Sequence, residues 1–154
     1  MVDEQVVAFG ERSRNLLQAL GLVAPNNPNK ELIFPDDLSR LGDAELGHHL
    51  SYWCNMCAYA HQKVSVLEGA LVIARAEYEQ EYDLRVYSKQ GSSVSERKVA
   101  VGASKKIREM KTRLALIEAD LKILKAILLG YDLKNSAVSR EITRRNHERN
   151  LRDS

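Results

Sequence analysis

Proline, cysteine and aromatic residues are all scarce in this 154-residue chain, and each scarcity narrows what the protein can be. The three prolines stand at positions 25, 28 and 35, so more than a hundred residues after Pro35 contain none. Proline breaks a helix because it lacks the backbone N–H and clashes with the preceding turn. The chain after Pro35 is therefore free to form long helices.

The two cysteines, Cys54 and Cys57, are too few and too close together for a disulfide framework. No apolar run approaches the ~20 residues that cross a bilayer, and the N-terminal stretch MVDEQVVAFGERSR lacks the basic start and apolar centre of a signal peptide. We therefore expect a cytoplasmic protein with reduced thiols and no membrane partner.

Sequence motifs of catalysis are also missing. The chain has no glycine-rich phosphate loop, no G-x-S-x-G and no H-E-x-x-H. Four carboxylates, Glu77, Glu79, Glu81 and Asp83, gather in one segment and offer either a divalent-metal site or a solvated acidic face that opposes basic residues. We favour the acidic face, and we expect no enzymatic activity, no bound metal and no cofactor.

Hydrophobic spacing predicts two long helices. One apolar series recurs in alternating steps of four and three, the heptad pattern of packed helices: Leu46, Leu50, Trp53, Cys57, Ala60, Val64, Leu67, Leu71, Ala74 and Tyr78. A second series follows the same rule: Ile107, Met110, Leu114, Ile117, Leu121, Leu124, Leu128 and Tyr131. The short SKQGSS linker between them predicts an antiparallel hairpin.

Capping residues suggest where these helices begin. Asp43 is a candidate N-cap for the first helix, and Ser93 with Glu96 is a candidate capping box for the second. A turn centred near Gly91 would place Trp53 opposite Leu128.

The same register would place Ala74 opposite Ile107. The fold class that follows is all-α: a long antiparallel helical hairpin, coiled-coil-like and oligomeric, with short flanking N- and C-terminal helices. Its single domain, residues 1–154, would comprise an N-terminal helix and loop (1–42), the hairpin (43–131) and a C-terminal basic helix (136–154). Gly130, Asn135 and Ser136 would break or bend the chain before this last helix, and Ser136 would cap it.

The spacing Cys54-x-x-Cys57 followed by His61 raises the question of a metal or redox site. On a helix these residues share one stripe, Cys57 within the heptad series and the other two at its edge. Structural zinc usually draws ligands from a turn and a second element, and a redox pair needs a βαβ context. We interpret Cys57 as a packing residue, and we expect His48 and His49 at the surface.

Charge is unevenly distributed although the formal net charge is only +2. Residues 84–113 hold nine basic and two acidic residues, beside Tyr82 and Tyr87. Such a mixture is typical of surfaces that neutralise phosphates and stack bases, and the alternative is a solvated face paired with nearby carboxylates. The candidate nucleic-acid-binding residues are Arg85, Tyr87, Lys89, Arg97, Lys98, Lys105, Lys106, Arg108, Lys111 and Arg113.

On one continuous helix, Arg97, Lys98, Lys105 and Arg108 would share an outward arc. A second arginine-rich region follows near the C-terminus and comprises Arg140, Arg144, Arg145, Arg149 and Arg152.

The segment LSYWCNMCAYAHQKVSVLEGALVIARAEYEQEYD, a basic turn region and then KTRLALIEADLKILKAILLGYDLKNSAVSREITRR resemble UvsY-like recombination mediators of tailed phages. The resemblance covers about residues 43 to 145, and the first forty residues have no counterpart in it. It implies an oligomeric, single-stranded DNA-binding protein that helps load a RecA-like recombinase onto strands covered by single-strand-binding protein. If the chain is phage-encoded, the compartment would be the host cytoplasm.

Two hypotheses remain from the sequence. The first is the non-enzymatic recombination mediator, and the second is a coiled-coil assembly or scaffold protein whose basic face binds an acidic protein. Three apolar residues off the heptad series, Leu116, Ile123 and Ile127, would be exposed on a monomer, and this predicts a homo-oligomer under either hypothesis.

Overall fold

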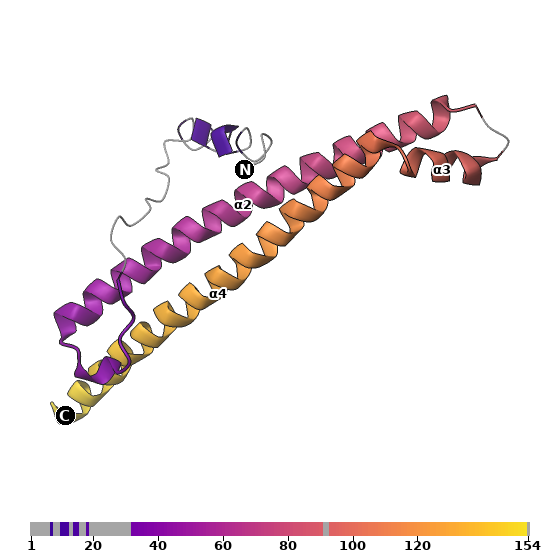
Figure 1. Cartoon of the computed structure of the whole chain (residues 1–154). Coiled ribbons are helices and arrows are strands. Elements are labelled where there is room, and N and C mark those ends of the chain that lie inside the picture. Colours follow the sequence, from indigo (N-terminus) through magenta and orange to yellow (C-terminus); the bar gives the residue numbers. More distant parts are fainter. Residues whose placement is uncertain are drawn as a thin grey trace. The chain divides into compact units, whose positions relative to one another are not determined.

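The structure is a computed structural model that describes residues 32–90 and 93–153, together with Val7, Gly10–Arg12, Arg14, Asn15 and Gln18. A short 3₁₀ turn, η1, spans Leu38–Arg40. Helix α2 spans Asp43–Ser88, α3 spans Val94–Gly102 and α4 spans Lys105–Arg152, and the described part of the chain contains no strand. Helices α2 and α4 pack together as a long antiparallel pair, with α3 at the connection between them (Figure 1). The all-α fold and the helix pair are therefore as predicted.

Burial follows the predicted heptad series. The buried members on α2 are Leu46, Trp53, Cys57, Ala60, Val64, Leu71 and Ala74. The buried members on α4 are Ile107, Ile117, Leu121 and Leu128, and the remaining members of both series are half-buried. Apolar residues that recur every 3.5 positions stay on one side of a helix, so that side of α2 and of α4 is buried along the length of the helix.

Contacts divide the chain into two compact units, which α2 and α4 both traverse. One unit comprises residues 23–63 and 124–154. Its core is a cluster of Leu46, Trp53 and Val138, against which the η1 segment places Phe34 and Leu38.

The other unit comprises residues 1–22 and 64–123. Two of its buried residues, Val66 and Ala70, lie off the heptad series on α2. A methyl group added at Gly10 would lie 3.8 Å from Val66 Cγ1, so Gly10 lies close to Val66. The described residues of the predicted N-terminal helix are helical, and its apolar residues Phe9 and Leu16 lie outside the described residues.

The second predicted helix starts differently from the prediction. Ser93 does cap a helix, since its hydroxyl accepts a hydrogen bond from the Glu96 N–H at 3.2 Å. That helix is the short α3, which ends at Gly102, and α4 begins at Lys105 after Ser104 Oγ accepts from the Ile107 N–H at 3.4 Å. A second serine cap therefore splits the predicted helix in two.

The predicted break before a separate helix at 136–154 was wrong. Helix α4 continues through Gly130, Asn135 and Ser136 to Arg152. Glycine inside a helix costs only about 1 kcal/mol. Burial of Val138 in the core on the far side of these residues offsets that cost, so the helix continues.

Asp43 was also wrongly assigned as the N-cap of the first helix. The Leu46 N–H donates to the Gly42 carbonyl at 2.9 Å, and the Gly42 N–H donates to Glu45 Oε2 at 2.7 Å. Gly42 therefore occupies the capping position, with Glu45 reaching back to it. The Asp43 carboxylate accepts hydrogen bonds from Arg145 and Arg149 instead.

The pairing register differs from the prediction by several residues. Ile107 belongs to a cluster against which Tyr78 and Tyr82 pack, and Trp53 contacts the Tyr131 ring at a centroid distance of 5.9 Å. A given residue of α2 therefore meets a residue further along α4 than predicted, because the split between α3 and α4 takes up extra residues at the tip. None of the described helices is long and apolar enough to cross a membrane.

Candidate nucleic-acid interface

The predicted basic block lies where α2 ends and α3 and α4 begin. A small apolar core of Val86, Val101 and Ile107, with one residue from each helix, holds these three helices together. Tyr78 and Tyr82 pack against it with their rings stacked at a centroid distance of 6.0 Å. The Tyr82 hydroxyl donates a hydrogen bond to the Lys98 carbonyl at 3.5 Å. We call this region, residues 78–113, the tip.

Four of the nine basic residues are in ion pairs. Arg85 and Lys106 both contact Glu81, at 2.5 Å and 2.9 Å. Arg113 lies 3.9 Å from Glu77, and Lys105 lies 3.7 Å from Glu109. The predicted acidic face opposite basic residues is thus present for Glu77 and Glu81.

The remaining basic residues differ in exposure. Lys89, Lys98, Arg108 and Lys111 are exposed, and none forms an ion pair with a residue that the structure describes. Arg97 is half-buried, and its Nε–H is buried without a hydrogen-bond partner among the residues that the structure describes. These four side chains are therefore accessible to a ligand.

The single outward arc expected for Arg97, Lys98, Lys105 and Arg108 is not present. The arc assumed one continuous helix, whereas Gly102 ends α3 and Lys105 begins α4. The two pairs are therefore carried by separate helices, and the small apolar core sets their relative placement.

Tyr87 is the most exposed aromatic residue of the tip. It exposes 83% of its surface although it follows the buried Val86 directly. Tyr82, the other tyrosine singled out from the sequence, is occupied by its stack with Tyr78 and its bond to α3. The described part of the tip therefore presents one free aromatic ring, two positions before Lys89 in the sequence.

The Cys-x-x-Cys stretch lies in the unit that comprises residues 23–63 and 124–154, and its side chains contact α4. Cys57 is buried, and burial followed by a hydrogen bond with Asp132 raises the pKa of its thiol to about 12. Cys54 is exposed, and its Sγ donates to Asn135 Oδ1 at 3.3 Å. Within the described residues, no three His, Cys, Asp or Glu side chains are grouped to hold a metal ion.

His48 is exposed as predicted, but His49 is buried, so the prediction of a surface position was wrong for it. Burial, followed by the nearby His48, lowers the pKa of His49. Its Nδ1 has no hydrogen-bond partner among the described residues. His49 stands one turn before Trp53 on α2 and so borders the apolar cluster, a position that the heptad count alone did not mark.

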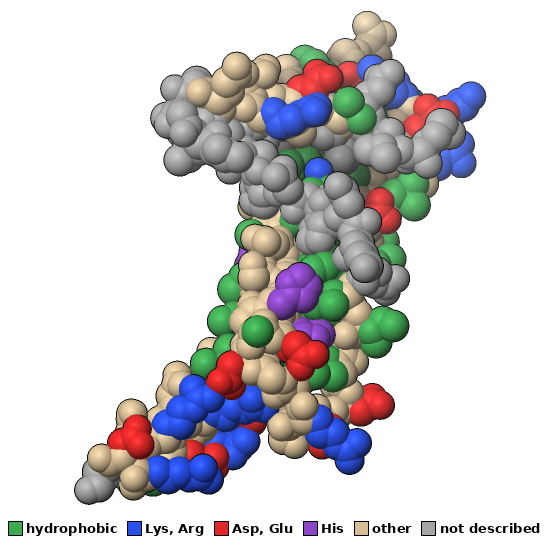
Figure 2. All heavy atoms as spheres, turned by 90° about the vertical axis from the view of Figure 1, so that its left-hand side faces the viewer, with side chains coloured by type: hydrophobic (Ala, Val, Ile, Leu, Met, Phe, Trp, Pro, Cys, Tyr) green, Lys and Arg blue, Asp and Glu red, His purple; other side chains and the backbone are tan. Residues whose placement is uncertain are grey.

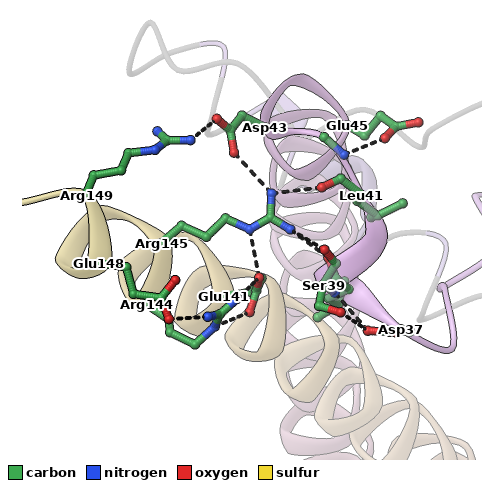
Figure 3. A network of polar contacts seen from close by, with 12 residues as sticks. Asp37, Ser39, Leu41, Asp43, Glu45, Glu141, Arg144, Arg145, Glu148 and Arg149 are labelled. Atoms are coloured by element: carbon green, nitrogen blue, oxygen red, sulfur yellow. Dashed lines mark hydrogen bonds and ion pairs between the residues drawn. The ribbon is translucent and has the colours of Figure 1, made fainter. Parts of the chain in front are cut away.

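Most arginines of the second arginine-rich region form ion pairs within the protein (Figure 3). Arg144 pairs with Glu141 and Glu148, and Arg149 pairs with Asp43. Arg145 contacts Glu141 and Asp43 and also donates to backbone carbonyls. These arginines stabilise the fold, and only the exposed Arg140 and Arg152 form no ion pair with a described residue.

Two features were missed by sequence reasoning. Lys134 places its ammonium 4.4 Å from the Trp53 ring centroid and 6.0 Å from those of Phe34 and Tyr131. The heptad spacing predicted that Trp53 and Tyr131 are packing residues. No local sequence signal predicted that Lys134 would lie over their rings. Glu81, which bridges two helices, was singled out only as one member of an acidic group.

Exposed apolar residues are numerous on α4. Leu116, Ile123 and Ile127 are exposed as predicted, by 62%, 61% and 44%. Leu129 and Leu133, which were not predicted, are also exposed. Figure 2 shows hydrophobic side chains at the surface of one face of the molecule, alongside Lys and Arg side chains that neighbour Asp and Glu.

No known protein family, curated protein or solved structure matches this chain.

Proposed function

We propose that this protein is a non-enzymatic, single-stranded DNA-binding recombination mediator and that the tip is its DNA-binding surface. The observation that carries the proposal is that the tip contains both the 83% exposed ring of Tyr87 and exposed cations with no ion-pair partner among the described residues. Burying an aromatic ring is favourable, so a freely exposed one in a region with several exposed cations suits a ligand that has both a flat apolar face and negative charge. An unpaired nucleotide has both.

The tip favours single strands over duplex for a physical reason. A base can stack on Tyr87 only when its face is free, and base–aromatic stacking contributes about 1–3 kcal/mol. Lys89, Lys98, Arg108 and Lys111 would neutralise phosphates, which releases counterions and makes binding weaken with salt. Neither interaction reads base edges, so little sequence preference is expected.

The role of mediator rests on the resemblance of residues 43–145 to UvsY-like proteins. In this role the protein would bind strands covered by single-strand-binding protein and help load a RecA-like recombinase. A homo-oligomer would present several tips to one strand, so that weak individual contacts add up through avidity. Leu116 and Ile123, exposed on α4, are the proposed contacts between subunits.

The salt dependence of DNA affinity tests the role of the tip. Fluorescence anisotropy with a labelled oligonucleotide at several salt concentrations should show that replacing Arg108 and Lys111 together by Ala weakens binding. The salt slope should flatten by about 1.4, which corresponds to two phosphates at ~0.7 each. Replacing Lys122 and Arg140, an exposed pair of the same type outside the tip, serves as the control and should change affinity much less.

Tyr87 provides an independent test of stacking. Tyr87→Ala should weaken single-strand binding by about 1–3 kcal/mol, while Tyr87→Phe keeps the ring and should bind as the unaltered protein does. Duplex affinity should be the same for all three. Equal single-strand affinity of the Ala and Phe variants would exclude stacking on Tyr87.

The second candidate function is a scaffold whose basic tip binds an acidic protein. The number of exposed apolar residues on α4, now including Leu129 and Leu133, favours an assembly protein. Failure of the unaltered protein to bind any nucleic acid at low salt would decide for this candidate.

Self-association is tested separately, by sedimentation velocity. Replacing Leu116 and Ile123 by Glu should lower the sedimentation coefficient, because a charge cannot be buried between subunits without large cost. Val72→Glu is the control, since Val72 is 66% exposed but lies on α2. An unaltered protein that stays monomeric at all concentrations would exclude the oligomer.

A further inference from the structure

One carboxylate at the tip contacts two of the candidate DNA-binding cations at once. Glu81 Oε1 lies 2.5 Å from Arg85 Nε on its own helix and 2.9 Å from Lys106 Nζ on α4. The Glu81 side chain is 24% exposed, whereas those of Arg85 and Lys106 are 38% and 54% exposed. The carboxylate is thus held beneath two cations whose outer sides face water.

This arrangement matches what a phosphate group would need. A guanidinium and an ammonium that converge on one anionic oxygen form charge-assisted hydrogen bonds with a carboxylate or with a phosphate alike. Glu81 therefore occupies the position that a nucleic-acid phosphate would take between Arg85 and Lys106. The other ion pairs of the tip are looser, with Lys105 and Glu109 at 3.7 Å.

We propose that Glu81 is an internal competitor of DNA phosphate: it holds Arg85 and Lys106 in the free protein and thereby limits the affinity of the tip for single strands. This inference rests on the proposed function and assigns a specific role to a residue outside the basic block. To use both cations, a bound phosphate has to displace the carboxylate, which must then be hydrated elsewhere. Each tip consequently binds more weakly than its number of cations suggests.

The charge state of Glu81 is consistent with this role. Hydrogen bonds from Lys106 and then Arg85 lower the pKa of the Glu81 carboxyl below its usual value. The carboxylate therefore stays ionised at neutral pH and competes throughout the range in which the protein would bind DNA. Weak binding by each tip suits a mediator, since the strand must be released to a recombinase.

The test compares Glu81→Gln with Glu79→Gln. Both changes remove one negative charge from α2, but Glu79 is exposed and forms no ion pair with a described residue. Anisotropy with a labelled oligothymidylate should show that Glu81→Gln binds roughly three- to tenfold more tightly than the unaltered protein, with a salt slope steeper by about 0.7. Glu79→Gln should stay within about twofold, because an exposed charge in water acts weakly.

A second variant tests the same idea without changing Glu81. Because Glu81 engages Lys106 in the free protein, Lys106→Gln should lower affinity less than about twofold, whereas Lys111→Gln, which removes a cation with no ion-pair partner among the described residues, should lower it roughly two- to fivefold. Equal losses for the two lysines would overturn the inference, even if Glu81→Gln failed to fold.

The outcomes separate the two levels of the proposal. Binding by the unaltered protein together with identical behaviour of the Glu81 and Glu79 variants, or weaker binding by Glu81→Gln, overturns the role of Glu81 alone. Absence of nucleic-acid binding by every protein at low salt overturns both that role and the proposed function. Circular dichroism of each variant confirms that helix content is retained.

Discussion

Arg145 Nη1 donates a hydrogen bond to the Leu41 carbonyl at 2.8 Å, although the two residues lie 104 positions apart in the chain (Figure 3). The same guanidinium donates to the carbonyls of Leu38 and Ser39 at 3.1 Å and 3.0 Å and pairs with Glu141. Its side chain is only 15% exposed. Arg145 of α4 thus supplies hydrogen bonds to backbone carbonyls of η1 and of the residues between η1 and α2.

Replacing Arg145 by Ala should destabilise the unit that contains residues 23–63 and 124–154. Three backbone carbonyls and two carboxylates would each lose the contact from Arg145, although Asp43 and Glu141 would keep their pairs with Arg149 and Arg144. We expect a loss of about 2–4 kcal/mol in the free energy of unfolding, measured by urea denaturation.

Arg152→Ala is the matched control for this experiment. Arg152 is the exposed last residue of α4, and its replacement should change the free energy of unfolding by less than about 0.5 kcal/mol. If the two variants were equally stable, the Arg145 contacts would not contribute to folding.

The Glu141 carboxyl should make stability depend on acid pH. Hydrogen bonds from Arg144 and then Arg145 lower its pKa from 4.5 to about 2 in the folded protein. A carboxyl with a lowered folded pKa stabilises the fold above its unfolded pKa and loses that contribution as the pH falls through the folded value. Thermal unfolding of the unaltered protein and Glu141→Gln should therefore differ most at pH 7 and converge between pH 4.5 and 2. A constant difference over that range would contradict the ion-pair origin.

The two thiols should react at very different rates. The thiolate is the reactive form, and Cys57 combines burial with a pKa raised to about 12, whereas Cys54 is exposed. At pH 8 an aromatic disulfide reagent should modify one thiol per chain rapidly and the second only after denaturation. Cys54→Ser should abolish the rapid phase and Cys57→Ser should retain it. Rapid modification of both thiols in the folded protein would show that Cys57 is not packed.

Ile107 and Leu116 should differ sharply in their contribution to folding. Ile107 is 2% exposed in the apolar core of the tip, and Leu116, on the same helix, is 62% exposed. Ile107→Ala should cost about 2–5 kcal/mol by leaving a cavity. Leu116→Ala should cost less than about 0.5 kcal/mol in samples dilute enough to be monomeric. Urea denaturation measures both, and equal costs would place Leu116 in a folded core.

Local signals predicted much of this fold because they act within a few residues. The steps of three and four from Leu46 to Tyr78 predict which side of α2 is buried, whatever lies against it. The cap at Ser93 was also predictable, since its hydroxyl bonds to the backbone three residues ahead. Ser104 was not recognised, because a serine inside a run that reads as helical carries the same local signal whether or not the helix ends there.

Longer-range features followed from packing. The tip takes up more residues than a simple turn, so Ile107 meets Tyr78 and Tyr82, and nothing local determines that offset. The continuation of α4 through Gly130 depends on the burial of Val138 beyond it.

The candidate interface divides in the same way between sequence and structure. The sequence by itself determined an all-helical pair with a concentration of positive charge at the turn, because periodicity and charge are counted along the chain. The tertiary structure alone decided which side chains remain accessible to a ligand. Glu81 forms ion pairs with Arg85 and Lys106, whereas the Arg108 guanidinium and the Tyr87 ring stay exposed. Ion pairing and burial depend on distances between side chains from different helices, and those distances exist only once the helices have packed.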